Sequence, residues 1–361
     1  MIRAGIIGCG DVARRAYIPD IQELADRITV VAAFDTVADR AGDIVGMFPG
    51  ATAYTSIEEF LDHEGGGAID LVFNLTPAPL HWQITAQVLE ARYHVYSEKP
   101  IASTVEEASE LVRIAEHRGR ELICAPATMV TGRFRWMKQF LDDGELGRTI
   151  AIKAHIGNMG PAAWGEYFGD PRVFYQQGVG PLIDTGVYML HVMTGLLGPA
   201  KRIQAVGGIA IPERGTTIPR LQGEKIEVTT PDLFSINVDF GGETYGHLYS
   251  SFAIPQSKAP YFELYGEQGA ISVDRVPWFH GNGPSDLFLL DRPLAGWRMV
   301  LPDPIRTNSI LGSGILHAIQ HLEDGEPLVM TAAHATHVLE IMNAAHESAQ
   351  TGEAIDVETT L

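Results

Sequence analysis

The sequence predicts an α/β protein: a parallel sheet in the N-terminal part is followed by an α+β region with a large, mostly antiparallel sheet. Up to about Ala125, short β-branched runs alternate with longer amphipathic segments, which is the pattern of βαβ units. Beyond Arg133, alternating and aromatic runs are separated by turns such as Phe240-Gly241-Gly242, which favours antiparallel strands. A chain of 361 residues exceeds the size at which one core usually keeps growing. We therefore expect two domains, residues 1–125 and residues 126–361.

The expected elements follow from these patterns. In the first domain, strands are expected at Ile2–Ile7, Thr29–Phe34, Leu71–Leu75, His94–Ser97 and Leu122–Cys124, and helices at Asp11–Leu24, Leu80–Ala91 and Thr104–Arg118. In the second, helices are expected at Arg133–Asp143, Leu182–Leu197, Gly314–Leu322 and Ala332–Gln350, and strands at Thr149–Ile156, Ile203–Ile209, Phe234–Phe240, Tyr245–Ser251, Tyr261–Tyr265 and Ala270–Val273. Ser103 or Thr104 is the expected N-cap of the third helix.

Charge and composition exclude several classes of partner. The chain carries 26 basic and 45 acidic residues, a formal net charge of -19, which is the wrong sign for binding nucleic acid or an anionic membrane. No apolar run approaches the roughly 20 residues of a membrane span, and the first residues are typical of a core strand rather than a signal peptide. Only Cys9 and Cys124 are present, which fits a reducing compartment. We expect a cytoplasmic protein.

A glycine turn follows the first strand. Gly8-Cys9-Gly10-Asp11-Val12-Ala13 matches Gly-x-Gly-x-x-Ala between a strand and a helix, the setting of the Rossmann dinucleotide fingerprint. Gly8 would allow the tight turn, Gly10 a close approach of the pyrophosphate, and Ala13 close helix packing, while the amides from Asp11 and Val12 onward face the phosphates. Asp35, after the second strand, suits the ribose hydroxyls and would repel a 2′-phosphate, which favours NAD over NADP. The alternative for Asp35 is an N-cap.

Two further segments directly follow strands of the predicted parallel sheet. Thr76-Pro77, with His81 at the start of the next helix, would line the cofactor cleft, or would simply form a turn. Glu98-Lys99-Pro100 follows another strand, where the Lys99 ammonium could polarise a substrate hydroxyl during hydride transfer. The alternative is a solvated charge pair on the surface.

The second half contains one dense candidate segment. Asp184 and Tyr188 are four residues apart and His191 three further, so an α-helix would place them on one face. They could supply a substrate anchor, a proton acceptor and a relay, or could be a helix-terminal carboxylate with two core side chains. In the preceding loop, Trp164, Tyr167 and Tyr175 would either stack on a sugar ring or pack locally; Trp164 and Tyr175 are the substrate-binding candidates.

Metal and nucleophilic chemistry find no support in the sequence. His317 with His321, and His334 with His337, have helical spacing but lack a His-Glu-x-x-His or Cys-x-x-Cys arrangement, so we expect no metal site. No Gly-x-Ser-x-Gly elbow is present, and hydrolysis through a serine nucleophile has no candidate.

In this order, the motifs resemble the Gfo/Idh/MocA oxidoreductases, the family of glucose-fructose oxidoreductase and inositol dehydrogenase. The resemblance rests on Gly8–Ala13, Thr76-Pro77 with His81, Glu98-Lys99-Pro100, Asp184-x-Gly186-x-Tyr188 and Leu197-Gly198-Pro199. It implies a Rossmann domain with a bound nicotinamide nucleotide, followed by an α/β domain whose open sheet forms the subunit interface of a homodimer or homotetramer.

The resemblance also implies roles for individual residues. Lys99 would be the catalytic lysine beside the nicotinamide, and Asp184 the carboxylate that binds the substrate. Tyr188 stands where many members have a histidine, which resembles the branch of glucose-fructose oxidoreductase and dihydrodiol dehydrogenase. A phenol of ordinary pKa, about 10, needs a nearby cation to act as a base, and Lys99 is the expected one. His191 is the alternative proton carrier.

The expected activity is therefore NAD-dependent hydride transfer at a carbinol carbon of a sugar, cyclitol or related polyol. Two alternatives remain open at the level of sequence. One is an enzyme that keeps its NAD tightly bound and recycles it, as an internal oxidoreductase or an NAD-dependent glycosidase. The other is a sugar- or NAD-sensing protein that has lost catalysis.

Overall fold

The computed structural model describes residues 1–361 except 64–67, 166, 168, 274–280, 292–295 and 308. The chain forms two compact units, which are described separately. Unit 1 contains Met1–Val130 and Ile305–Leu339, and unit 2 contains Thr131–Pro304 and Glu340–Leu361. Residues 305–339 thus pack with the N-terminal part of the chain. Whether residues 1–125 fold as a domain by themselves stays a prediction.

Unit 1 is built on a six-stranded parallel sheet, sheet A. Its order is β3-β2-β1-β4-β5-β6, and every pairing in it is parallel. This is the Rossmann order. The strands are β1 (Ile2–Ile7), β2 (Ile28–Phe34), β3 (Thr52–Tyr54), β4 (Leu71–Asn74), β5 (His94–Ser97) and β6 (Leu122–Cys124).

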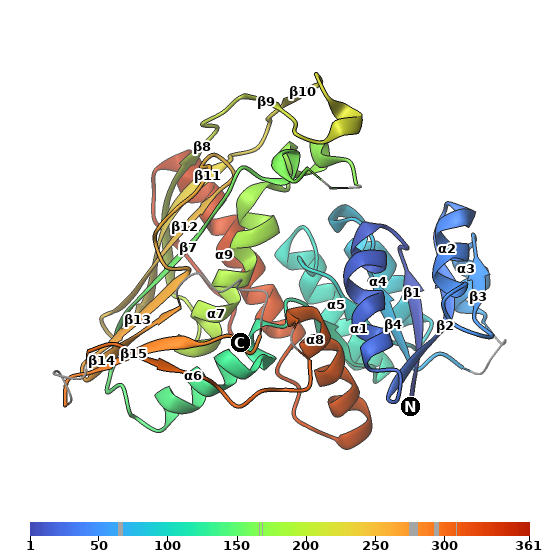
Figure 1. The fold of residues 1–361 in the computed structure, drawn as a ribbon, viewed down its shortest axis with the longest axis horizontal. Coiled ribbons are helices and arrows are strands. Elements are labelled where there is room, and N and C mark those ends of the chain that lie inside the picture. Colours follow the sequence, from blue (N-terminus) through green and yellow to red (C-terminus); the bar gives the residue numbers. More distant parts are fainter. Residues whose placement is uncertain (64–67, 166, 168, 274–280, 292–295, 308) are drawn as a thin grey trace. The chain divides into compact units, whose positions relative to one another are not determined.

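The connections between these strands are mainly helical (Figure 1). The helices of unit 1 are η1 (Ala13–Tyr17), α1 (Ile18–Glu23), α2 (Ala38–Val45), α3 (Ile57–Leu61), η2 (Ala78–Leu80), α4 (His81–Glu90), α5 (Val105–Arg118), η3 (Thr128–Val130), α8 (Ile310–Ile319) and η9 (Gln320–Asp324). Helix α4 packs beside α5, and α8 packs against α1. Thr104 caps α5 in a capping box with Glu107, which confirms the expected start of this helix.

The five strands expected in this part of the chain are present within a residue of their predicted ends. Strand β3 and helices α2 and α3 were not expected. They are short, with three, eight and five residues. The predicted helix Asp11–Leu24 contains the π-helical turn η1, followed by α1, so its hydrogen-bond pattern changes along its length.

Unit 2 is built on a nine-stranded sheet, sheet B. Its order is β16-β15-β14-β13-β7-β12-β11-β8-β17, with one parallel pair, β7 with β12, among antiparallel ones. The strands are β7 (Thr149–Gly157), β8 (Arg202–Gly208), β11 (Leu233–Gly241), β12 (Thr244–Ser251), β13 (Phe262–Gly266), β14 (Gly269–Val273), β15 (Ser285–Leu289), β16 (Arg298–Val300) and β17 (Ile355–Asp356). The short strands β9 (Glu213–Gly215) and β10 (Lys225–Glu227) form a separate pair.

Sheet B buries one face. Alternate residues of its central strands, such as Ile152 and Ala154 in β7 and Ile236 and Val238 in β11, are buried, while their neighbours are partly exposed. Helix α7 (Val187–Leu197) packs on β7 and β12 and contacts α6 (Gly132–Asp142) (Figure 1). The remaining helical segments are η4 (Pro161–Ala163), η5 (Pro171–Tyr175), η6 (Leu182–Gly186) and η7 (Pro219–Leu221), and α9 (Ala332–Thr351) runs from unit 1 into unit 2.

The predicted fold class is confirmed: a parallel Rossmann-type sheet is followed by a large and mostly antiparallel one. The expected helix Leu182–Leu197 is present as η6 and α7. The short or late strands β9, β10, β15, β16 and β17 were not expected. In the part of the chain that the structure describes, no helix combines the length and the apolar character that crossing a membrane requires.

Candidate functional site

The glycine turn lies at the carboxyl end of β1, as predicted. Gly8 has a φ of 88°, and a Cβ at this position would lie 2.8 Å from the carbonyl carbon of Leu75 and from the amide nitrogen of Thr76. A side chain there would clash with backbone, which cannot move aside as a flexible side chain can. Only glycine therefore lets the turn pass directly beneath the loop that follows β4.

The rest of the turn is open where a ligand would have to approach. A Cβ added at Gly10 would meet nothing within 4 Å, and Val12 is 46% exposed although it is apolar. The helix begins here, and its first bond runs from the Arg14 amide to the Gly10 carbonyl. Ala13, the first residue of η1, is fully buried. The amides of Gly10, half-buried Asp11 and Val12 are thus available to an anion, and this turn fits a dinucleotide pyrophosphate.

Asp35 lies at the end of β2 with only 7% of its surface exposed. One carboxylate oxygen accepts a hydrogen bond from the Cys9 amide at 2.9 Å, and the other accepts one from the Val37 amide at 2.9 Å. The carboxylate therefore fastens the glycine turn to the second strand. Each oxygen keeps further lone pairs, so a ribose hydroxyl could still bind. Its role toward a cofactor stays a prediction.

Cys9, inside the same turn, has an unreactive thiol. Burial, together with the charge of Asp35, raises the pKa of its thiol to about 12. The thiol is therefore neutral at physiological pH and adds no negative charge beside a bound phosphate.

The loop after β4 is held by a residue that sequence reasoning missed. Buried Asn74 donates to the His81 carbonyl at 3.1 Å and to Thr85 Oγ1 at 3.0 Å, and its own oxygen accepts from the Thr76 hydroxyl at 2.6 Å. The signal in the sequence is a polar side chain that ends an apolar strand. Thr76 is half-buried and Pro77 is exposed at the tip of this loop.

His81 connects two of the loops. Its Nδ1 lies 2.6 Å from the Pro100 carbonyl and its Nε2 lies 2.8 Å from the Thr76 carbonyl. Burial lowers the pKa of His81, while the two carbonyl acceptors oppose this effect because each needs an N–H. With 1% of its surface exposed, His81 acts on the neighbouring loops and positions them. The predicted direct contact with a cofactor is untested.

Glu98 and Lys99 follow β5 at the same edge of sheet A. The Glu98 carboxylate accepts from the Tyr17 hydroxyl at 2.6 Å and from the Lys99 amide at 2.9 Å. Tyr17 belongs to the helix after the glycine turn, so this carboxylate links that helix to the end of β5. Lys99 is half-buried beside it. The strand register places Ile7 beside Asn74 and Asn74 beside Ser97, so the glycine turn, the Thr76 loop and Lys99 come together at one edge.

Asp184, Tyr188 and His191 lie in unit 2. Residues 182–186 form the π-helical turn η6, so the α-helical spacing assumed from the sequence begins only at Val187. Gly186 sits close to β12, where a Cβ would lie 3.0 Å from Ser250 Oγ. Asp184 is half-buried, whereas Tyr188 and His191 are 6% and 4% exposed. A single π-helical turn is frequent at functional sites, because it shifts the side chains that follow it.

The aromatic residues of the loop before η6 have different environments. Trp164 is 40% exposed and lies edge-on to Tyr167, so its ring surface is open to a ligand. Tyr175 is fully buried against Phe252, and its hydroxyl accepts from the Ala162 amide and donates to the Met159 carbonyl. These contacts favour packing as the role of Tyr175. Its predicted contact with substrate is untested and would require the loop to move.

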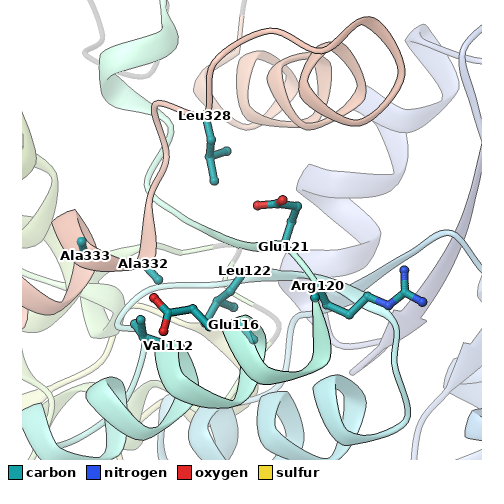
Figure 2. Close-up of a pocket in the computed structure, with 10 residues that line it drawn as sticks. Val112, Glu116, Arg120, Glu121, Leu122, Leu328, Ala332 and Ala333 are labelled. Atoms are coloured by element: carbon teal, nitrogen blue, oxygen red, sulfur yellow. The ribbon is translucent and has the colours of Figure 1, made fainter.

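A cavity of about 320 Å³ lies elsewhere in unit 1, between α5, β6 and the segment at Leu328–Ala333 (Figure 2). None of the predicted site residues lines it. Among the described residues, no group of three or more His, Cys, Asp or Glu side chains is arranged to hold a metal ion.

Comparison with known proteins identifies the family of this chain. Residues 2–125 match the oxidoreductase family with an NAD-binding Rossmann fold, Gfo/Idh/MocA, and residues 134–272 match the C-terminal domain of the same family. The chain therefore belongs to the Gfo/Idh/MocA oxidoreductases, as the sequence motifs predicted.

The similarity to individual relatives extends over most of the chain. A dTDP-3,4-didehydro-2,6-dideoxy-alpha-D-glucose 3-reductase from Streptomyces antibioticus is 28% identical over 277 residues, which cover 76% of each protein. A scyllo-inositol 2-dehydrogenase (NADP(+)) from Bacillus subtilis is 23% identical and covers 99% of this chain and 96% of its own. The crystal structure of aldose-aldose oxidoreductase from Caulobacter crescentus, complexed with glycerol, shares the fold with a TM-score of 0.79 at 18% identity, and 99% of each chain is covered.

Proposed function

We propose that this oxidoreductase transfers a hydride between a nicotinamide cofactor and a carbinol carbon of a sugar, cyclitol or related polyol. The observation that carries the proposal is the edge of sheet A, where a sterically required glycine, an open helix start and Lys99 come together in a chain of this family. The names of the relatives, a sugar reductase and an inositol dehydrogenase, support the substrate class. The bound nicotinamide would supply or accept the hydride.

Residues of unit 1 would hold the dinucleotide. The amides at Gly10, Asp11 and Val12 would bind the pyrophosphate, because they start a helix and face open space. Asp35 would bind the adenosine ribose, and the Thr76-Pro77 loop would lie against the nicotinamide half. His81 and Glu98 would keep this loop and the end of β5 in place through the contacts described above.

NAD is the cofactor that we propose, with NADP as the less favoured one. The Asp35 carboxylate would repel a 2′-phosphate. Arg40 Nη1, however, lies 3.9 Å from Asp35 Oδ1 on a side chain that is 55% exposed, and one relative is named as an NADP(+) enzyme. The preference therefore depends on the balance between this carboxylate and this guanidinium.

The proton would be handled by Lys99 and Tyr188, with Asp184 holding the substrate. A phenol with an ordinary pKa of about 10 exchanges protons poorly at neutral pH, and an ammonium group beside it stabilises the phenolate. His191 is the alternative carrier. Trp164 would present its exposed ring to the sugar.

We also propose that the protein is cytoplasmic and assembles as a homodimer or homotetramer through sheet B. Both cysteines are buried and free, which fits a reducing compartment. Apolar side chains on the sheet, including Val206 and Tyr245, are 68% and 56% exposed, a feature of surfaces that bind a partner.

The proposed activity is tested by an NAD-coupled absorbance screen over sugars, sugar acids and cyclitols, run in both directions and with both cofactors. We expect turnover with at least one member of the panel. The absence of turnover across the panel, with NAD retained through purification and product formed without net NADH, would replace this proposal with a recycled-cofactor enzyme. Binding of NAD and sugar without any turnover would indicate a sensor.

A further inference from the structure

A second cavity lies in unit 1 at the opposite edge of sheet A. It has a volume of about 610 Å³ and is located where β1, β4 and β5 begin. Arg3, Asp70, Arg92, His94 and Arg120 are among the residues that line it. Because the glycine turn lies at the carboxyl ends of the same strands, this cavity is separate from the dinucleotide site. We call it the Arg92–Arg120 cavity.

The charges in this cavity are only partly matched. The Glu323 carboxylate, which also lines it, pairs with the N-terminal ammonium and with Arg27. Arg3 and Asp70 neutralise each other through Nε and Nη2 bonds of 2.9 and 2.7 Å. Within the described ranges, neither Arg92 nor Arg120 forms an ion pair with a carboxylate. Figure 2 shows that the Arg120 side chain points away from Glu116 and Glu121, the acidic residues of the neighbouring pocket. Arg120 Nε is buried and has no hydrogen-bond partner in the described structure.

His94 adds a third donor that lacks an acceptor. Its Nδ1 accepts a hydrogen bond from the Glu121 amide at 2.9 Å, so Nδ1 carries no proton and Nε2 must carry one. Arg120 Nη1 lies 3.4 Å from this Nε2. A guanidinium has no acceptor, so this pair places two N–H donors face to face. An acceptor atom placed between the two groups would satisfy both.

The backbone conformation of Arg92 is a second unusual feature of this cavity. Arg92 follows α4 with a φ of 68°, in the left-handed region where helices usually place glycine. An arginine in this conformation is strained, and its exposed side chain lines the cavity.

A simpler explanation is that Arg92 and Arg120 only offset the negative ends of α4 and α5, which they follow in the sequence. That explanation does not account for the N–H groups of Arg120 and His94 that face each other. A positive charge near the end of a helix offsets the helix dipole without any such arrangement. The simpler explanation also predicts no ligand.

We propose that the Arg92–Arg120 cavity binds a phosphate group, either as inorganic phosphate or as the phosphate of a small phosphorylated metabolite. Two guanidinium groups and one imidazole N–H match the several acceptor oxygens of a phosphate dianion. The volume leaves room for an organic group attached to that phosphate. Since the net charge of the chain is -19, the site depends on these local donors rather than on the field of the whole protein.

The test is isothermal titration calorimetry on the full chain at constant ionic strength, with NAD saturating so that the glycine turn cannot bind the titrant. Inorganic phosphate and ribose 5-phosphate are titrated separately, and the tighter ligand shows which source the site serves. We expect saturable binding at one site. Arg120→Gln should weaken it about tenfold or more, because it removes a charged donor.

Two further variants separate binding from folding. Arg92→Gly should raise the melting temperature, because glycine relieves the strained backbone, and should weaken phosphate binding, because the charge is lost. Arg113→Gln is the matched control: it removes a charge from the exposed face of α5, where Arg113 lies 3.8 Å from Glu110, and should leave binding unchanged. Absence of saturable binding, equal binding by Arg120→Gln, or equal binding of acetate would overturn the proposal.

Discussion

The two units both bury polar groups near their candidate sites, but they use them differently. In unit 1, Asn74, His81 and Glu98 each bind loops that meet at one edge of sheet A, so the buried contacts act directly on the predicted site residues. In unit 2, Arg214 and Asp232 form a buried ion pair, and Arg214 also donates to the Met159 carbonyl and lies over the Tyr175 ring. The comparison separates groups that order a site from groups that hold its supporting structure together.

Among the changes that test this comparison, breaking the ion pair in unit 2 should have the largest effect, on the free energy of unfolding. The side chains of Arg214 and Asp232 are 3% and 1% exposed, and Asp232 also accepts from the Ala210 and Ile211 amides. Arg214→Met leaves a buried carboxylate without its cation, so the free energy of unfolding should fall by about 3–5 kcal/mol. Denaturant unfolding measures it. Arg148→Met breaks the half-exposed pair with Glu267 and should cost about 0–1 kcal/mol. Equal losses in the two variants would contradict the structural role.

The next effect tests the site in unit 1. Lys99→Ala should lower kcat about a hundredfold, because the proposed proton transfer loses its cation, while the Kd for NAD changes little. Steady-state kinetics and cofactor titration separate the two quantities. Lys138→Ala, an exposed lysine paired with Asp142 on α6, is the matched control and should be neutral. Unchanged kcat in Lys99→Ala would exclude the catalytic role.

A smaller effect is expected on the preference between NAD and NADP. Asp35→Asn keeps an acceptor for the Cys9 amide, loses the one for the Val37 amide and removes the negative charge beside Arg40. The ratio of kcat/KM for NADP to that for NAD should rise about tenfold, since a charge repulsion toward the 2′-phosphate is lost. Kinetics with both cofactors give the ratio. A ratio that does not change would mean that Asp35 only fastens the turn.

The smallest effect should come from the link between the glycine-turn helix and β5. Tyr17→Phe removes the hydrogen bond to Glu98 but keeps the buried ring, so stability should fall by about 1 kcal/mol. Unfolding experiments give this value, and the affinity for NAD should fall with it because the turn is less well fixed. A loss of stability with unchanged affinity would show that the link serves the fold alone.

Much of unit 1 could be predicted because its signals are local. A glycine turn between a strand and a helix, and the period of the βαβ units, are visible in short windows. Tyr17 was missed because its partner, Glu98, is 81 residues away in the chain. Asn74 was missed although its partners are near in sequence, because a polar residue at the end of a strand does not by itself show which groups it binds. The pair Arg214–Asp232 was missed because neither residue belongs to a motif, and only tertiary folding brings Arg214 in β9 to Asp232, the residue before β11.

The sequence by itself determined the family, the fold class and the edge of sheet A that carries the glycine turn, because these depend on periodicity and on the spacing of a few residues. Tertiary structure decided what each polar side chain contacts. It placed Asp35 against the Cys9 amide, buried Tyr175, turned residues 182–186 into a π-helical segment and directed the donors of Arg120 and His94 at one point. Hydrogen bonds are directional and short, so they depend on distances between segments that a local pattern does not contain.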